Sequence, residues 1–340
     1  MKLQITTITL FLGITLLAIV AGMGTTANAQ TLTLTSDGIN LGFTLSTFAT
    51  LNPGYNGFGP FGVALAGPDR VLVENVENDN TRYVFHDVDG QTRGSAITST
   101  TMNPTGALAY ATAGGLAYGG TTQFGQFAQY DTSGNVSKVL TGVPETTLRG
   151  MWGNPVNGHV LATSQMNSQF SIIDIDPNGT GSSRTVRSGF SDLDGLTVSP
   201  DGKTVYVESA QSILGFDIAT GNAVFNSGVL AGGPDGMGVV SSNNQLNGDL
   251  IVNFNNGFVD LLDPTTLQLT VIASGGTRGD YASPDPTNGT LFLDYSEAVY
   301  RLSCGPDCSL GGDTPEPSSL TLLGSGVVGL GGLLRRRLLG

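Results

Sequence analysis

The 340-residue sequence is poor in the side chains that most often carry out chemistry or bind nucleic acid. It holds two histidines, two cysteines, one tryptophan, and 14 lysines and arginines against 27 acidic residues. An anionic surface repels nucleic acid, so a nucleic-acid-binding role is excluded. Two thiols with no histidine nearby are too few ligands for zinc. The sequence also lacks a G-x-x-x-x-G-K-[ST] phosphate loop and a CxxCH haem attachment site.

The chain begins with the pattern of a secretory signal peptide. Lys2 precedes an apolar stretch, residues 8–20, and small residues follow up to Ala27-Asn28-Ala29. A basic start, an apolar middle and an A-x-A site are typical of a cleaved signal. We therefore predict a signal peptide over residues 1–29, with a retained membrane anchor as the alternative.

The other end carries a second apolar run, residues 318–334, followed by Arg335, Arg336 and Arg337. As a helix the run would span about 26 Å, slightly less than the bilayer core of about 30 Å. Arginines at its far end would stay cytoplasmic by the positive-inside rule. The sequence therefore predicts a transmembrane helix over 318–334, a basic cytoplasmic tail over 335–340 and an exported remainder. A permanent tail anchor is the alternative.

Pro315, Glu316 and Pro317 stand directly before that run. Pro-Glu-Pro, an apolar helix and an arginine cluster together resemble the PEP-CTERM sorting signal of Gram-negative bacteria. The resemblance implies export through the translocon, a precursor held transiently in the inner membrane, and cleavage near Pro-Glu-Pro by an exosortase. It also implies a final location at the cell surface or outside the cell, in association with exopolysaccharide.

The exported part, residues 30–310, repeats six times. A glycine followed by a short apolar strand recurs at steps of 44, 44, 45, 41 and 43 residues. Each unit continues with a turn rich in Gly, Pro, Asn and Asp and then two further strands, and five units add a more polar fourth strand. Four strands in about 43 residues predict an all-β, six-bladed β-propeller. The repeat glycines are Gly62, Gly106, Gly150, Gly195, Gly236 and Gly279.

The sixth unit ends at Cys308 without a fourth strand. The chain start offers one, because residues 43–50 precede the first unit at the offset that the other fourth strands keep. We expect this strand to complete the last blade and close the ring, which removes exposed sheet edges. A β-sandwich or solenoid is the alternative. Residues 311–317 have the composition of a flexible linker.

Export permits a disulfide between Cys304 and Cys308. Once Lys2 and the three terminal arginines are set aside, 10 basic residues face 27 acidic ones in the exported part. This surface would be soluble and could attract divalent cations.

Ligands of propellers usually bind at the loops and strand starts around the central channel. Here these positions are Phe61, Thr105, Arg149, Asp194, Asp235 and Arg278, with Asp280 just beyond the last repeat glycine. Two carboxylates and two arginines could thus share one mouth, where they would pair with each other, cap turns or bind a ligand. Trp152 follows the third repeat glycine and is expected either in the core or as a platform for stacking a sugar.

"LDGLTVSPDGKTVYVES" and "GPDGMGVVS" resemble two blades of the gluconolactonase-like propellers. The resemblance implies a divalent cation in the channel, with Asp194 and Asp235 at two ligand positions. It fails at Phe61, where the family has a ligand Glu, and at Arg149, where it has an Asn-Asp pair. An arginine repels a cation but suits a carboxylate or an acidic sugar. A Ca²⁺ ion held by Asp194, Asp235 and Asp280 is left as the metal hypothesis.

Two functions follow from these observations. The first is a non-enzymatic surface or matrix protein that needs no cofactor and presents a rigid disc to polysaccharide or to another envelope protein. The second is a metal-dependent lactonase or lyase-like enzyme in the channel. Carboxylates converging on one point would favour the enzyme, whereas Arg149 and Arg278 neutralising Asp194 and Asp235 would favour the binding protein. No catalytic residue is assigned, and His86 and His159 are expected to be surface or strand residues.

Overall fold

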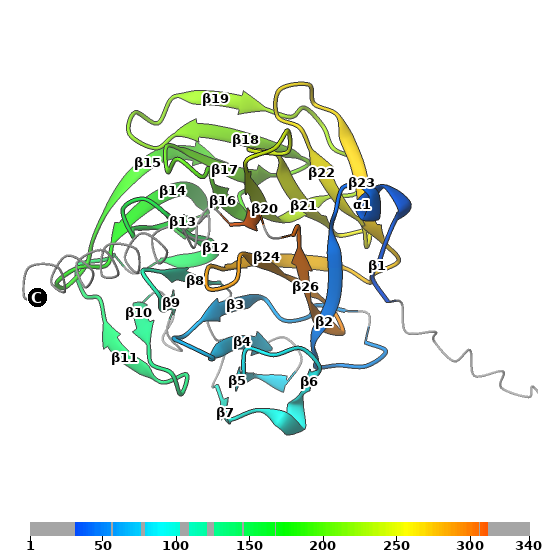
Figure 1. The fold of residues 1–340 in the computed structure, drawn as a ribbon. Helices are drawn as coiled ribbons and strands as arrows, with labels where there is room; N and C mark the ends of the chain where they lie inside the picture. Colours follow the sequence, from blue (N-terminus) through cyan, green and yellow to red (C-terminus); the bar gives the residue numbers. More distant parts are fainter. Residues whose placement is uncertain are drawn as a thin grey trace, which may run out of the picture.

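The computed structural model describes residues 31–311, except for 56, 76–78, 103–108, 121–125, 145, 167 and 306. The predicted signal peptide, sorting signal, transmembrane helix and basic tail lie outside these residues, as do Thr105 and Gly106. Within the described part the strands form six antiparallel sheets arranged around a central axis, which confirms the six-bladed propeller (Figure 1).

Each blade has four strands, ordered from the axis outward. Blade 1 consists of β3 (Gly62–Leu65), β4 (Val71–Asn75), β5 (Thr81–Phe85) and β7 (Thr98–Thr101). Blade 2 consists of β8 (Tyr110–Ala113), β9 (Leu116–Gly120), β10 (Phe127–Tyr130) and β11 (Val136–Val139). Blade 3 consists of β12 (Thr147–Gly153), β13 (Val160–Met166), β14 (Gln169–Asp176) and β15 (Ser182–Phe190).

The second half of the ring repeats this arrangement. Blade 4 consists of β16 (Leu196–Val198), β17 (Thr204–Ser209), β18 (Ser212–Asp217) and β19 (Ala223–Asn226). Blade 5 consists of β20 (Pro234–Ser242), β21 (Leu250–Phe254), β22 (Val259–Leu262) and β23 (Leu269–Ser274). Blade 6 consists of β24 (Gly279–Asp285), β25 (Thr290–Tyr295), β26 (Ala298–Ser303) and β2 (Thr44–Thr50).

Strand β2 closes the ring, as the sequence predicts. It pairs antiparallel with β26 from Thr44↔Ser303 to Thr50↔Ala298 and supplies the strand that the sixth unit lacks (Figure 1). A short strand of blade 1, β6 (Gln91–Thr92), pairs with the outer side of β2, just before the 3₁₀ turn Arg93–Ser95. This pairing of β2 in blade 6 with β6 in blade 1 joins the last blade directly to the first.

Burial explains the composition of the strands. The inner strands β3, β20 and β24 are buried along their whole length, because each packs between two neighbouring blades. The outer strands β7 and β11 are mostly exposed, which agrees with their polar sequences. The cores lie between blades; one of them joins Phe48 of β2 and Phe292 of blade 6 to Val63 and Phe85 of blade 1.

Both ends of the described chain bind blade 5, which the repeat pattern does not reveal. Strand β1 (Thr33–Leu34) pairs with the outer strand β23, and helix α1 (Ser36–Asn40) follows it, capped by the Thr35 hydroxyl. Strand β27 (Cys308–Leu310) pairs with the inner strand β20. Cys304 and Cys308 form a disulfide at the start of β27.

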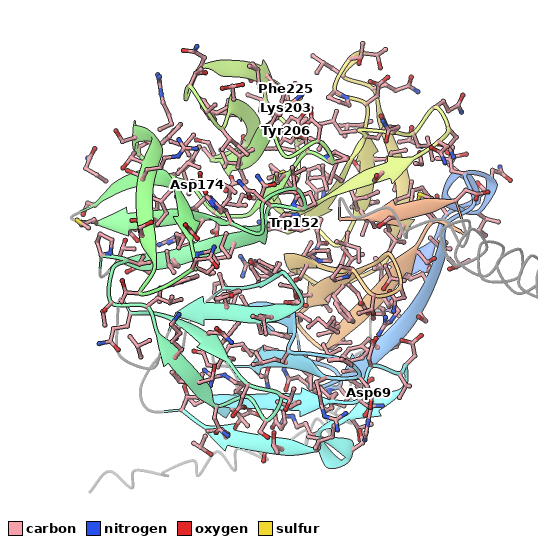
Figure 2. All side chains as sticks on the ribbon, turned by 60° about the vertical axis from the view of Figure 1, so that its left-hand side comes forward. Asp69, Trp152, Asp174, Lys203, Tyr206 and Phe225 are labelled. Atoms are coloured by element: carbon pink, nitrogen blue, oxygen red, sulfur yellow. A yellow bond between two sulfur atoms is a disulfide. The ribbon has the colours of Figure 1, made fainter. Side chains whose placement is uncertain are left out.

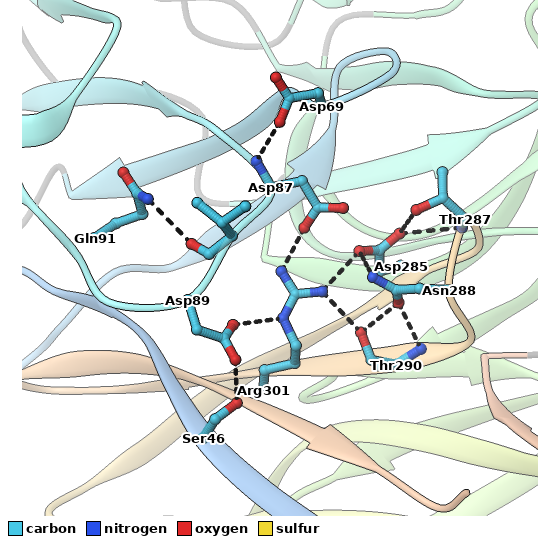
Figure 3. Close-up of polar contacts among 11 residues, drawn as sticks. Ser46, Asp69, Asp87, Asp89, Gln91, Asp285, Thr287, Asn288, Thr290 and Arg301 are labelled. Atoms are coloured by element: carbon cyan, nitrogen blue, oxygen red, sulfur yellow. Dashed lines mark hydrogen bonds and ion pairs between the residues drawn. The ribbon is translucent and has the colours of Figure 1, made fainter. Parts of the chain in front are cut away.

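Arg301 joins the two blades that meet at the closure (Figure 3). Its Nε donates to Asp89 at 2.9 Å, its Nη1 to Asp285 at 3.0 Å, and its Nη2 to Asp87. The guanidinium also packs on the rings of Phe48 and Phe292, 5.1 and 4.7 Å from their centres. Because these partners come from blades 1 and 6, Arg301 links the two blades at the closure of the ring. We call this junction the seam.

Candidate functional site at the upper mouth

The inner strands all run in the same direction along the axis. We call the end at which they begin the upper face and the end at which they finish the lower face. In blades 3 to 6, two residues at the upper end of the inner strand face one residue of the second strand, which makes a β-bulge. The bulges are Arg149–Gly150 opposite Thr163, Asp194–Gly195 opposite Glu208, Asp235–Gly236 opposite Asn253, and Asp280–Tyr281 opposite Asp294.

The bulges explain the repeat glycines. A Cβ at Gly150 would collide with the carbonyl oxygen of Asp194, the first bulge residue of the next blade. A Cβ at Gly195 would likewise meet the carbonyl oxygen of Asp235, and one at Gly236 that of Asp280. Glycine recurs there because adjacent inner strands approach too closely for a side chain.

The prediction that Gly279 is the sixth repeat glycine is wrong in register. The bulge of blade 6 is Asp280–Tyr281, so Tyr281 takes the place of the glycine and Gly279 precedes the bulge. Asp280 is therefore the counterpart of Asp194 and Asp235. Arg278 stands two residues before Asp280. It therefore does not occupy the bulge position that Arg149, Asp194, Asp235 and Asp280 share.

Tyr281 reaches across the axis. Its hydroxyl accepts a hydrogen bond from the Met151 N–H at 2.8 Å and donates toward the carbonyl oxygens of Met151 and Tyr110, at 2.6 and 2.9 Å. A side chain of blade 6 thus binds the inner strands of blades 2 and 3. Tyr281 is 6 % exposed, and its side chain links three blades across the axis.

Arg278 organises one side of the mouth. Its Nη1 lies 3.2 Å from Asp280 and its Nη2 3.4 Å from Asp235, while its Nε donates to Asn255 Oδ1 at 2.5 Å. The guanidinium carbon lies 4.2 Å from the centre of the Phe58 ring, and 51 % of Phe58 is exposed. Arg278 is therefore oriented by three polar partners and one ring while remaining 29 % exposed.

Arg149 takes the corresponding role on the other side. Its Nη1 lies 3.8 Å from Asp194, and its guanidinium lies 5.2 Å from the ring of Phe170. Its buried Nε has no hydrogen-bond partner. The structure thus brings together the predicted residues Arg149, Asp194, Asp235, Arg278 and Asp280, and it pairs each arginine with at least one carboxylate.

The carboxylates outnumber the arginines, and burial raises the pKa values of the more enclosed ones. Burial raises the pKa of Glu208 to about 9, and the negative charges of Asp194 and Asp192 add to this shift. Burial also raises the pKa of Asp235 well above its ordinary value, reinforced by Asp194 and Asp280 and opposed by Arg278. At neutral pH the mouth is therefore less negative than its composition suggests.

Four polar residues that the sequence pattern did not predict lie behind the mouth. Thr163, Glu208, Asn253 and Asp294 each oppose a bulge, and all four are at least 96 % buried. They occupy the fourth position of "VLATS", "VYVES", "LIVNF" and "LFLDY", and Glu74 occupies it in "VLVEN". A polar residue at one fixed place in otherwise apolar strands was the available signal. Both carboxylate oxygens of Asp294 lack a hydrogen-bond partner, as does Oδ1 of Asn253.

Trp152 is a core residue, which confirms one of its two expected places, and its alternative role as a stacking platform at the channel mouth is wrong. Its side chain is fully buried in the core with Leu161 and Leu196, inside the molecule (Figure 2). It follows the bulge in β12, where the side chain turns between blades instead of toward the axis. His86 and His159 lie beside Asp69 and Asp174, at 2.7 and 2.8 Å, away from the upper mouth.

The upper mouth does not fit a divalent cation as it stands. No group of three or more His, Cys, Asp or Glu side chains among the described residues is arranged to hold a metal ion. Arg278 lies between Asp235 and Asp280, where a cation bound by both would have to be. Its positive charge takes the role that a metal would have there.

Residues 313–337 match the PEP-CTERM protein-sorting motif. The chain carries a PEP-CTERM sorting signal. Such a signal implies export and a membrane-anchored precursor that an exosortase processes. Within the described part of the chain, no helix is long and apolar enough to cross a bilayer. A search of curated proteins finds no match.

Solved structures share the propeller fold. A gluconolactonase from Xanthomonas campestris superposes with a TM-score of 0.58 at 15 % identity, over 80 % of this chain and 93 % of that one. Regucalcin from Agrobacterium tumefaciens, a calcium-binding protein, gives 0.55 at 13 % identity, over 76 % and 95 %. A virginiamycin B lyase from Staphylococcus aureus gives 0.50 at 14 % identity, over 77 % and 99 %. At these identities the likeness establishes the fold alone.

Proposed function

We propose that the protein is an exported cell-envelope propeller that acts as a non-enzymatic binding protein, with the upper mouth as its ligand site. The observation that supports this proposal is the pairing of Arg149 with Asp194 and of Arg278 with Asp235 and Asp280. These pairs occupy the carboxylates that a channel metal would need. They also leave parts of both guanidinium groups open to solvent, where they can donate hydrogen bonds to a ligand.

The chemistry of the mouth suits a polysaccharide with acidic groups. Partly exposed guanidinium groups bind carboxylates and sulfates bidentately, and neighbouring carboxylates accept hydrogen bonds from hydroxyl groups. The exposed ring of Phe58 next to Arg278 supplies an apolar surface on which a sugar ring can pack. An envelope exopolysaccharide combines acidic, hydroxyl and ring surfaces in one repeating ligand.

The binding proposal is tested by titrating the exported protein with acidic and neutral envelope polysaccharides. We expect Arg278→Gln to weaken binding of an acidic polysaccharide at least tenfold, because the charge-assisted contacts are lost. Arg187→Gln is the matched control, since Arg187 is an exposed arginine that packs on the Phe216 ring away from the mouth. Equal binding by both variants would remove the mouth from consideration.

A metal-dependent lactonase or lyase-like enzyme is the second candidate. The propeller fold that the chain shares with a gluconolactonase and with calcium-binding regucalcin favours it, as do the unpartnered oxygens of Asp294. This function needs Arg278 to leave Asp235 and Asp280 so that Ca²⁺ can take its place. Metal analysis and melting with and without EDTA separate the two functions. A stoichiometric metal whose removal lowers Tm would support the enzyme, whereas a metal-free protein with unchanged Tm would support the binding protein.

Exosortase processing is proposed to cut the chain near Pro315-Glu316-Pro317 after export. Replacing these three residues by alanine should cause the uncut, membrane-held form to accumulate in the native host. The measurement is the apparent mass of the protein in membrane and extracellular fractions. Unchanged processing of the triple-alanine chain would contradict the role of this motif.

A further inference from the structure

The described chain leaves the propeller near the axis of the lower face. Gly311 packs on Pro284 at the lower end of β24, and its N–H donates to the carbonyl oxygen of Val239 in β20 at 2.9 Å. It also lines a cavity of about 440 Å³ with residues from the lower ends of four inner strands or the turns after them. These are Leu65 of blade 1, Thr112 of blade 2, Gly153 of blade 3 and Pro284 of blade 6. A point that meets four blades at once lies at the centre of the face.

Several independent contacts fix this exit. β27 pairs with β20 from Ser242↔Cys308 to Val240↔Leu310, and its three residues are buried. The Leu310 N–H donates to the Gly289 carbonyl oxygen at 2.9 Å, and the disulfide holds Cys308 to the end of blade 6. The chain can leave the lower face only if the pairing of β27 with β20 is broken. This pairing therefore keeps the exit at the centre of the face.

The segment between this exit and the predicted membrane run is short. Six residues, 312–317, separate Gly311 from Ser318. Fully extended, they span at most about 25 Å between these two positions. A domain of roughly 280 residues has a radius of gyration of about 19 Å, so its full width is close to twice the reach of this segment. The segment is too short to pass around the rim of the propeller.

We infer that the membrane-held precursor stands with its lower face toward the bilayer and its upper mouth pointing away from it. This inference rests on the membrane-held precursor of the proposed function. An inverted propeller would need the segment to run from the centre of one face past the edge to the other, which exceeds its reach. The upper mouth is thus open to ligands before the tail is cut.

The charge of the lower face indicates that the tail, and not adhesion, holds the propeller there. Exposed or partly exposed aspartates occupy its turns, and hydrogen bonds to these carboxylates hold their pKa values below the usual range. They are Asp69, Asp176, Asp201, Asp217 and Asp263. Arg70 and Lys203 pair with two of them, Asp69 and Asp201, but the five aspartates outnumber these two cations, and anionic lipid headgroups repel such a surface. Cleavage of the tail would therefore release the protein from the membrane.

The orientation is tested with a matched pair of single-cysteine labels. Val156 lies in the turn after β12 on the lower face, and Val229 lies in the loop before β20 on the upper face; they are 66 % and 77 % exposed. Val156→Cys and Val229→Cys precursors are exported in a bacterium without an exosortase, labelled with a fluorophore and placed in vesicles that carry nitroxide-headgroup lipids. Because Cys304 and Cys308 are bonded, the introduced thiol is the one that reacts.

We expect the label at position 156 to be quenched several-fold more strongly than the label at position 229. Equal quenching, or stronger quenching at position 229, would overturn the orientation. Failure of both precursors to float with the vesicles would instead refute the membrane-held precursor and, with it, this inference. Vesicles without nitroxide lipids give the unquenched reference for each label.

Discussion

Arg278 at the upper mouth and Arg301 at the lower seam are bound in similar ways but serve different ends. Each guanidinium contacts more than one aspartate and packs on at least one phenylalanine ring. Arg301 is 9 % exposed and joins blade 6 to blade 1, whereas Arg278 is 29 % exposed and stands beside the exposed ring of Phe58. Burial therefore separates an arginine that closes the fold from one that can meet a ligand.

The carboxylates of the two faces also differ, because their pKa values are shifted in opposite directions. At the upper mouth, burial and neighbouring charges raise the pKa values of Glu208 and Asp235. On the lower face, hydrogen bonds from turn residues lower the pKa values of Asp217 and Asp263. Burial thus disfavours the charged form of the carboxylates at the upper mouth, whereas hydrogen bonds favour the charged form on the lower face.

The largest effect is expected from Arg301→Gln. It leaves Asp87 and Asp285 enclosed without their cation, and breaking a buried ion pair by removing one partner costs on the order of 3–5 kcal/mol. The free energy of unfolding from denaturant titration measures this loss. Asp89→Asn is the control, because Asp89 is 41 % exposed and its loss leaves the other pairs intact. If Arg301→Gln lowered the free energy of unfolding by less than about 1 kcal/mol, Arg301 would not stabilise the junction of blades 1 and 6.

The next effect concerns pH at the upper mouth. Glu208 keeps a proton in the folded protein up to about pH 9 but loses it near 4.5 when unfolded. Stability should therefore fall as the pH rises from about 5 to 9, by on the order of a few kcal/mol. Glu208→Gln cannot titrate, so its stability should change much less over this range. Parallel pH profiles of the parent and the variant, from urea midpoints at each pH, would rule out this assignment.

A smaller effect is expected from Arg278→Gln. Because Arg278 is partly exposed and Asp235 can take up a proton, the free energy of unfolding should fall by only about 1 kcal/mol. Thermal unfolding of this variant beside Arg301→Gln measures the difference between the two arginines. Equal losses would mean that Arg278 also serves the fold, and the contrast between mouth and seam would disappear.

The repeat and its closure could be predicted from the sequence, because each depends on local patterning. Turn residues and apolar strands recur at a fixed spacing, and residues 43–50 stand at the offset of a fourth strand; β2 pairs with β26 as expected. Strands β1 and β27 could not be predicted in this way. They are two and three residues long, and their pairing with blade 5 depends on contacts across more than 60 residues of chain.

The candidate site could be predicted less completely than the fold, because it depends on the register and the path of individual strands. Gly279 resembles a repeat glycine, so the shift that places Tyr281 in the bulge could not be read from spacing. Trp152 follows a bulge, and only the three-dimensional path of β12 shows that it turns into the core. Residues such as Glu208 could have been found, because a polar side chain recurs at one position of the second strands.

The smallest effect lies on the lower face and has the opposite sign with pH. The Thr220 hydroxyl and backbone N–H lower the pKa of Asp217 below 3.8, so its contribution to stability is present at neutral pH and is lost as the pH falls through the lowered value. Asp217→Asn should be slightly less stable at pH 7 and should lose less of its Tm between pH 4 and 2 than the parent protein. Glu208→Gln should leave that acid range unchanged, because its proton is bound in both states there. If Asp217→Asn altered the alkaline range instead, the division of charge between the two faces would be wrong.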